Sequence, residues 1–147
     1  MTSVRALAPV ALLLLSVACA SGPPFAPVPT TPPDKAIVYV YRTAQFVGDG
    51  VTYTVNAGGK PLVKLLPNGY IALLAEPRET EFSAETEATS SITLDLEAGQ
   101  TYYLKGGIGV GFLVGHPKLT LVDATTGSSE IVNCKKLPPA SLGLDTP

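Results

Sequence analysis

The chain has 147 residues, with ten Lys and Arg against twelve Asp and Glu, which gives a formal net charge of −2 at pH 7. This mild acidity argues against nucleic acid as a partner, and the length allows one domain with a single core. With one histidine and two cysteines that stand far apart, we expect no metal site and no cofactor.

The chain begins with an apolar stretch, Ala6–Ala18, which only Ser16 interrupts and which Arg5 precedes. It is shorter than the roughly 20 apolar residues that span a bilayer, but it fits the core of a secretory signal. The small residues before Cys19 resemble the lipobox of bacterial lipoproteins. The resemblance implies that residues 1–18 are a cleaved signal peptide and that Cys19 carries a thioether-linked diacylglycerol and an amide-linked acyl chain. The alternatives are an ordinary cleaved signal with an unrelated cysteine, and an uncleaved signal anchor.

Residues 20–34 contain six prolines, which exclude regular helix and sheet pairing. We expect residues 19–34 to form a lipidated, Pro-rich tether, about 45 Å long if residues 20–34 extend at roughly 3.1 Å per residue. A disordered leader that spaces nothing in particular is the alternative.

Period-two alternation starts after the prolines, in residues 51–56, 79–85 and 92–97. The run Ala36–Tyr41 is apolar on both faces, which is typical of a central strand. Gly-bearing turns separate these runs, and no segment shows a helical period with caps. The sequence therefore predicts an all-β fold for residues 35–136. We expect an antiparallel β-sandwich, immunoglobulin-like or transthyretin-like, of about seven or eight strands, with a closed barrel as the alternative. Residues 137–147 are predicted to be a disordered tail.

Four segments carry a family resemblance: Pro33–Arg42, Gly99–Lys105, Leu121–Gly127 and Cys134–Lys135. In order and spacing they are similar to a bacterial family of small lipoproteins, catalogued as domain of unknown function 2846. The resemblance covers about residues 34–136 and implies a sandwich with a lipid anchor. It implies no activity. The chain departs from the family where a Pro-Gly turn would precede Glu79, because Pro77 is followed by Arg78.

Candidates for catalysis are few. Glu79, Glu81, Glu85 and Glu87 would share one face of a strand. Members two residues apart would be roughly 6.8 Å from each other, a spacing open to an inverting glycosidase or a weak calcium site. We interpret them as a solvated face that opposes aggregation. The only histidine, His116, lies in a turn-like Gly-His-Pro context and is interpreted as a surface residue. No catalytic residue is therefore predicted.

The glycine-rich stretch 106–115 would place Ile108, Val110, Phe112 and Val114 in one apolar row if it forms a strand. The row either closes the core behind a curved strand or forms a partner surface.

Cys134 is interpreted as a buried, inert residue at the end of a strand over residues 129–134, with an interchain disulfide as the alternative.

Together these features predict a non-catalytic binding or structural module of the bacterial envelope, held at the membrane through Cys19, with an envelope protein or glycan as partner. Ala20 rather than Asp after Cys19 implies, by the sorting convention of Gram-negative lipoproteins, the periplasmic face of the outer membrane. The alternative is an envelope enzyme that acts on glycan or peptide.

Overall fold

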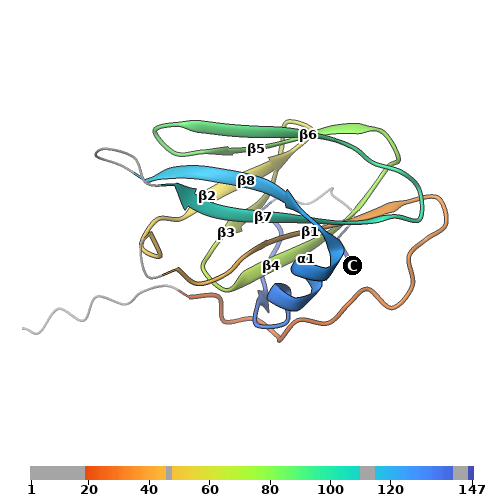
Figure 1. Ribbon diagram of the computed structural model, residues 1–147, viewed down its shortest axis with the longest axis horizontal. Helices are drawn as coiled ribbons and strands as arrows, with labels where there is room; N and C mark the ends of the chain where they lie inside the picture. Colours follow the sequence, from red (N-terminus) through yellow and green to blue (C-terminus); the bar gives the residue numbers. More distant parts are fainter. Residues whose placement is uncertain (1–18, 46–47, 110–114, 141–145) are drawn as a thin grey trace, which may run out of the picture.

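Two β-sheets packed face to face form the body of the computed structural model, which describes residues 19–45, 48–109, 115–140 and 146–147 (Figure 1). One sheet has five strands in the order β8-β7-β1-β4-β9, and the other has four in the order β3-β2-β5-β6. The strands are β1 (Ala36–Arg42), β2 (Tyr53–Ala57), β3 (Lys60–Leu65), β4 (Gly69–Ala75), β5 (Glu79–Glu85), β6 (Thr89–Asp95), β7 (Thr101–Gly109), β8 (His116–Val122) and β9 (Lys135–Lys136). One helix occurs in the described part of the chain, α1 (Ala124–Ile131), and it follows β8.

The all-β sandwich predicted from the sequence is confirmed. Because the strands fall into two sheets, the closed barrel is not the architecture. The strand count is nine rather than seven or eight, and the two-residue β9 is one of them. Most pairs are antiparallel, but β1–β7 and β4–β9 are parallel.

The main core lies between the two sheets, where the alternating strands place their apolar residues. Phe82 and Ala84 of β5 point inward, while Glu81 and Glu85 of the same strand are exposed. This is the period-two pattern expected of a strand with one face in the core and one in solvent.

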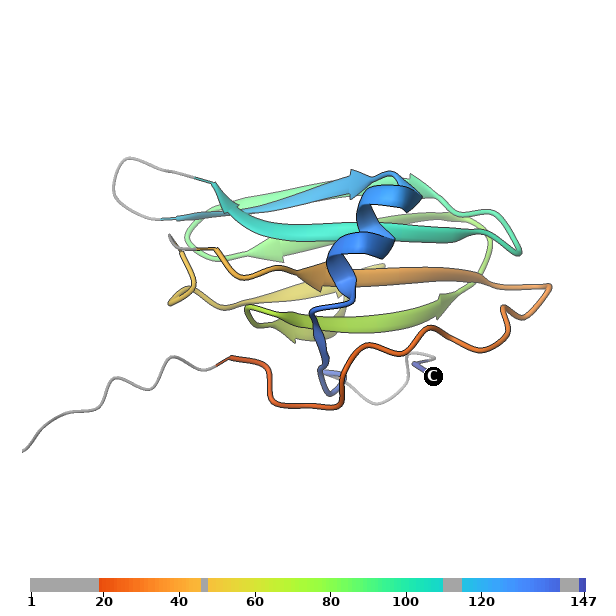
Figure 2. The same ribbon diagram turned by 60° about the horizontal axis from the view of Figure 1, so that its bottom comes forward.

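A second, smaller core covers the outer face of the five-stranded sheet. It is built around Ile37, Tyr39 and Tyr41 of β1, whose other face supplies the main core. All seven residues of β1 are buried, so the prediction of a central strand packed on both sides is confirmed. The helix α1 and the N-terminal segment lie across this outer face (Figure 2).

The expectation that the chain contains no helix is wrong at α1. The helix takes up the first half of the strand expected over residues 129–134. Its N-cap Asp123 accepts a hydrogen bond from the Thr126 backbone N–H at 2.9 Å. Gly127 is buried against the Tyr103 ring, where a Cβ would overlap the ring. The helix is therefore stabilised by its cap and by packing rather than by helix propensity.

The expectation of a loose tail is wrong for residues 137–140. Leu137 is buried, and its N–H donates to the Tyr70 carbonyl at 2.8 Å. Ala140 donates to the Leu62 carbonyl at 2.7 Å, and Pro139 forms a bridge with Val63 of β3. These residues therefore link the edges of the two sheets. Residues 141–145 lie outside the described part of the chain.

Candidate functional site

Cys19, the predicted lipidation residue, is exposed at one end of the sandwich and directly adjoins the folded core. The next residue, Ala20, is only 6% exposed and belongs to the main core. Its N–H donates to the carbonyl of Pro67, in the β3–β4 connection, at 3.3 Å. The chain is thus fixed one residue after the predicted anchor.

Residues 20–28 form a strap along the edge and outer face of the five-stranded sheet, which differs from the free tether expected from the prolines. Phe25 N–H donates to the Cys134 carbonyl at 3.0 Å, and Lys136 N–H donates to the Pro23 carbonyl at 2.8 Å. Gly22 lies so close to Lys136 that a Cβ there would overlap the Lys136 carbonyl oxygen. The strap therefore extends the sheet beyond β9. Prolines have no backbone N–H, so the hydrogen bonds to the sheet use the N–H groups of Phe25 and Lys136 instead.

Aromatic contacts hold the strap over the sheet. The Phe25 ring meets the rings of Tyr39 and Tyr70 edge-on, with centroids 5.6 and 5.0 Å away. The Tyr39 hydroxyl accepts a hydrogen bond from the Val28 N–H at 2.8 Å. These contacts were not foreseen, although a lone phenylalanine in a Pro-rich run was a sequence signal for them.

Of the predicted apolar row, only Ile108 lies in the described residues; Val110, Phe112 and Val114 lie outside them, so the partner surface stays a prediction. Ile108 is half-buried and packs on the main core, close to Gly48 and Gly115. This placement matches the interpretation of a row that closes the core.

The described glycines of β7 serve packing on one face and leave a groove on the other. A Cβ at Gly106 would overlap Leu65 and crowd the Tyr53 hydroxyl, which donates to the Gly107 carbonyl at 3.1 Å. On the outer face lies a groove of about 420 Å³, lined by Gln45, Lys105, Gly106–Gly109, Lys118 and Thr120.

Cys134 is 1% exposed, and its thiol donates to the Arg42 carbonyl at 3.6 Å. Burial, with a smaller contribution from the nearby Glu130 carboxylate, raises the pKa of this thiol to about 11. A buried, protonated thiol is a poor nucleophile, so the geometry agrees with the inert interpretation and leaves no access for an interchain disulfide.

The acidic row is only partly assembled. Glu79, Glu81 and Glu85 are exposed on β5, whereas Glu87 lies in the connection to β6. His116 is exposed at the first position of β8, opposite Gly109, so it is a strand residue rather than a turn residue. His116 and these carboxylates do not form a metal cluster, since no group of three potential metal ligands occurs among the described residues.

A connected set of ionisable side chains lies elsewhere, between α1 and the sheet. Glu130 accepts hydrogen bonds from the Tyr41 hydroxyl and the Lys105 ammonium, both at 2.6 Å. The bonds from Lys105 and Tyr41 lower the pKa of Glu130, while burial and the carboxylate raise the pKa of Tyr41. The network holds the helix on the sheet, and sequence analysis missed it because it spans 89 residues of sequence separation.

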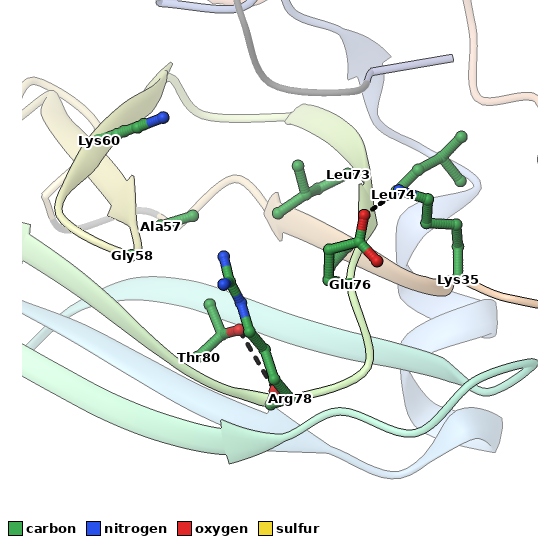
Figure 3. Close-up of a pocket in the computed structure, with 10 residues that line it drawn as sticks. Lys35, Ala57, Gly58, Lys60, Leu73, Leu74, Glu76, Arg78 and Thr80 are labelled. Atoms are coloured by element: carbon green, nitrogen blue, oxygen red, sulfur yellow. Dashed lines mark hydrogen bonds and ion pairs between the residues drawn. The ribbon is translucent and has the colours of Figure 1, made fainter.

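The far end of the sandwich, formed by connections 58–59, 76–78 and 96–100, contains a pocket of about 220 Å³ (Figure 3). Lys35 and Glu76 form an ion pair at its rim, and Arg78 extends into the space beside Gly58. The pocket is lined by Lys35, Ala57, Gly58, Lys60, Leu73–Glu76, Arg78 and Thr80. The lining has three cationic side chains, Lys35, Lys60 and Arg78, and one carboxylate, Glu76. Such a lining suits a ligand with an anionic group, such as a carboxylate or phosphate.

Among the described residues, no helix has the length and apolar character needed to cross a membrane. Searches of protein-family models, curated proteins and solved structures found no match to this chain. The resemblance to the small lipoprotein family therefore remains a prediction.

Proposed function

We propose that the protein is a lipid-anchored, non-catalytic module of the bacterial envelope, attached to the membrane through Cys19. The observation that carries the proposal is the apolar segment Ala6–Ala18, which ends in small residues directly before an exposed cysteine. A modified residue must be accessible, and Cys19 is exposed directly before the buried Ala20. Two or more acyl chains would make the attachment durable, since each buried methylene contributes about 0.8 kcal/mol.

The module acts by holding a binding surface at the membrane, which raises its local concentration toward neighbouring envelope components. The far-end pocket, with Lys60 and Arg78, is the surface proposed to meet an anionic group of an envelope protein or glycan. The proposed location is the periplasmic face of the outer membrane.

Replacement of the anchor tests the proposal. Cys19→Ser removes the acceptor thiol, so the variant should leave the membrane fraction for the soluble periplasmic fraction, whereas Ser21→Ala should stay with the membrane. Both Cys19 and Ser21 are exposed. A Cys19→Ser protein that remains membrane-bound at the unaltered level would refute the lipid anchor.

A further inference from the structure

The anchored residue has almost no free chain between it and the fold. Ala20 is buried and bound to Pro67, so Cys19 alone separates a lipid from the sandwich. One residue spans about 3.6 Å at most, whereas a free run of residues 20–34 would reach about 45 Å. A lipid on Cys19 would therefore bring the adjoining end of the sandwich to the bilayer surface.

That end, here named the Cys19 end, includes the connections β1–β2, β3–β4 and β5–β6, in their described residues 43–45, 48–52, 66–68 and 86–88. It also includes the described Gly115 of the β7–β8 connection, because β7 runs parallel to β1. Figures 1 and 2 both show the start of the described chain at this end, near the β1–β2 and β3–β4 connections. The Ala44 N–H donates to the Asn68 side-chain oxygen at 2.8 Å, and Asn68 follows Pro67. Ala44, Asn68 and Pro67 are thus neighbours of the anchor.

The two ends differ in charge. The described residues of the connections at the Cys19 end carry two formal charges, those of Asp49 and Glu87, and Lys135, which pairs with Gly69 beside them, adds a third. The far end carries several charged residues in its connections and in the segment that enters β1, namely Asp34, Lys35, Glu76, Arg78 and Glu97. Bringing the Cys19 end close to lipid headgroups therefore removes fewer ions from water.

Two of the charges near the anchor face each other within the protein. Arg42 is fully buried and donates to the carbonyls of Val51 and Gly48 at 2.6 and 2.7 Å. Asp49 lies 3.8 Å from the same guanidinium. Arg42 thus holds the β1–β2 connection in place, and its positive charge partly neutralises Asp49, the one carboxylate of that connection.

We infer that the anchored sandwich lies directly on the bilayer, with its Cys19 end against the lipid headgroups and its far end directed away from them. The partner is the headgroup surface of the membrane that holds the lipid. This inference rests on the proposed function, because it requires a lipid on Cys19. The docked strap, not a flexible stalk, sets the orientation.

Two exposed alanines give a matched pair of probe positions, Ala44→Cys at the Cys19 end and Ala98→Cys at the far end. Each lipidated variant carries a thiol-reactive fluorophore, while Cys134 stays buried and unlabelled. In phosphatidylethanolamine–phosphatidylglycerol vesicles with a nitroxide quencher on the headgroup, the label at position 44 should be quenched several-fold more than the label at position 98. Equal quenching at both positions would overturn the inference.

A second variant tests whether the strap sets the orientation. Gly22→Val places atoms where the Lys136 carbonyl lies, so it should release the strap and bring the quenching at position 44 down to that at position 98. Ala26→Ser, an exposed strap position, should retain the difference. Unchanged quenching in Gly22→Val would contradict the role of the strap.

Flotation of the same vesicles separates the two proposals. Protein that fails to float with vesicles lacks the anchor, and the proposed function then fails. Protein that floats but shows equal quenching keeps its anchor and contradicts only the orientation.

Discussion

At the scale of single residues, Cys134 shows how burial decides reactivity. Two lysines follow it in the sequence, yet the thiol is enclosed and its pKa is raised to about 11. We expect native protein at pH 8 to leave Cys134 unmodified by iodoacetamide, while urea-unfolded protein reacts fully, as followed by mass spectrometry. Rapid modification of the native protein would contradict the burial of this thiol.

Glu130 makes stability depend on pH. Its pKa in the folded protein lies below the ordinary value of 4.5, so its contribution is present above about pH 4.5 and is lost as pH falls through the lowered pKa. Glu130→Gln should lower the free energy of unfolding by about 1 kcal/mol at pH 7, because it removes the carboxylate charge of the ion pair with Lys105. The deficit should shrink below pH 4.5 in urea titrations.

Glu85→Gln is the control for this change, because Glu85 is exposed on β5. We expect it to alter the free energy of unfolding by less than about 0.5 kcal/mol at either pH. Equal effects of the two substitutions would mean that the network does not stabilise the fold.

At the scale of elements, the strap is the feature with the clearest mutational test. Phe25→Ala removes two aromatic contacts and half-buried surface, so we expect a loss of about 2 kcal/mol in the free energy of unfolding. Val132→Ala, at a position 56% exposed, should cost less than about 0.5 kcal/mol. If Phe25→Ala matches this control in urea titrations, the strap does not contribute to the folded unit.

The strands were predictable from the sequence because the pattern of apolar residues that marks a strand lies within the strand itself. Alternation in residues 79–85 and double-sided apolarity in Ala36–Tyr41 report burial directly, and the structure confirms both. The helix was not predictable by the same means. Its sequence contains a glycine and two threonines, so propensity opposes it, and its stability comes from the Tyr103 ring and the Asp123 cap.

The strap was missed for a related reason. Prolines exclude the regular ladder, so the sequence predicts a free tether rather than a segment that pairs with a sheet. The structure satisfies it instead with isolated bonds, such as Phe25 to Cys134, and with hydroxyls of distant tyrosines. Contacts of that kind depend on the tertiary fold and leave almost no local pattern.

At the scale of the whole molecule, the sequence identified the anchor candidate but not the pocket. Lys60 and Arg78 are 18 residues apart and line one pocket only because the β2–β3 and β4–β5 connections lie at the same end. A photo-reactive amino acid at position 60 should crosslink to an anionic envelope component in intact cells, and Arg78→Ala should reduce the yield. Position 64, exposed on the same strand, is the control. Identical adducts at both positions would contradict the pocket as the binding surface.

The proposed orientation and the proposed role of the pocket at the membrane both require a lipid on Cys19. The mass of the mature amino-terminal peptide is therefore the most direct measurement. Purification from membranes and mass spectrometry should find a peptide that begins at Cys19 and carries a diacylglycerol and an amide-linked acyl chain. A mature protein whose Cys19 thiol is unmodified, recovered free of membranes, would contradict the account.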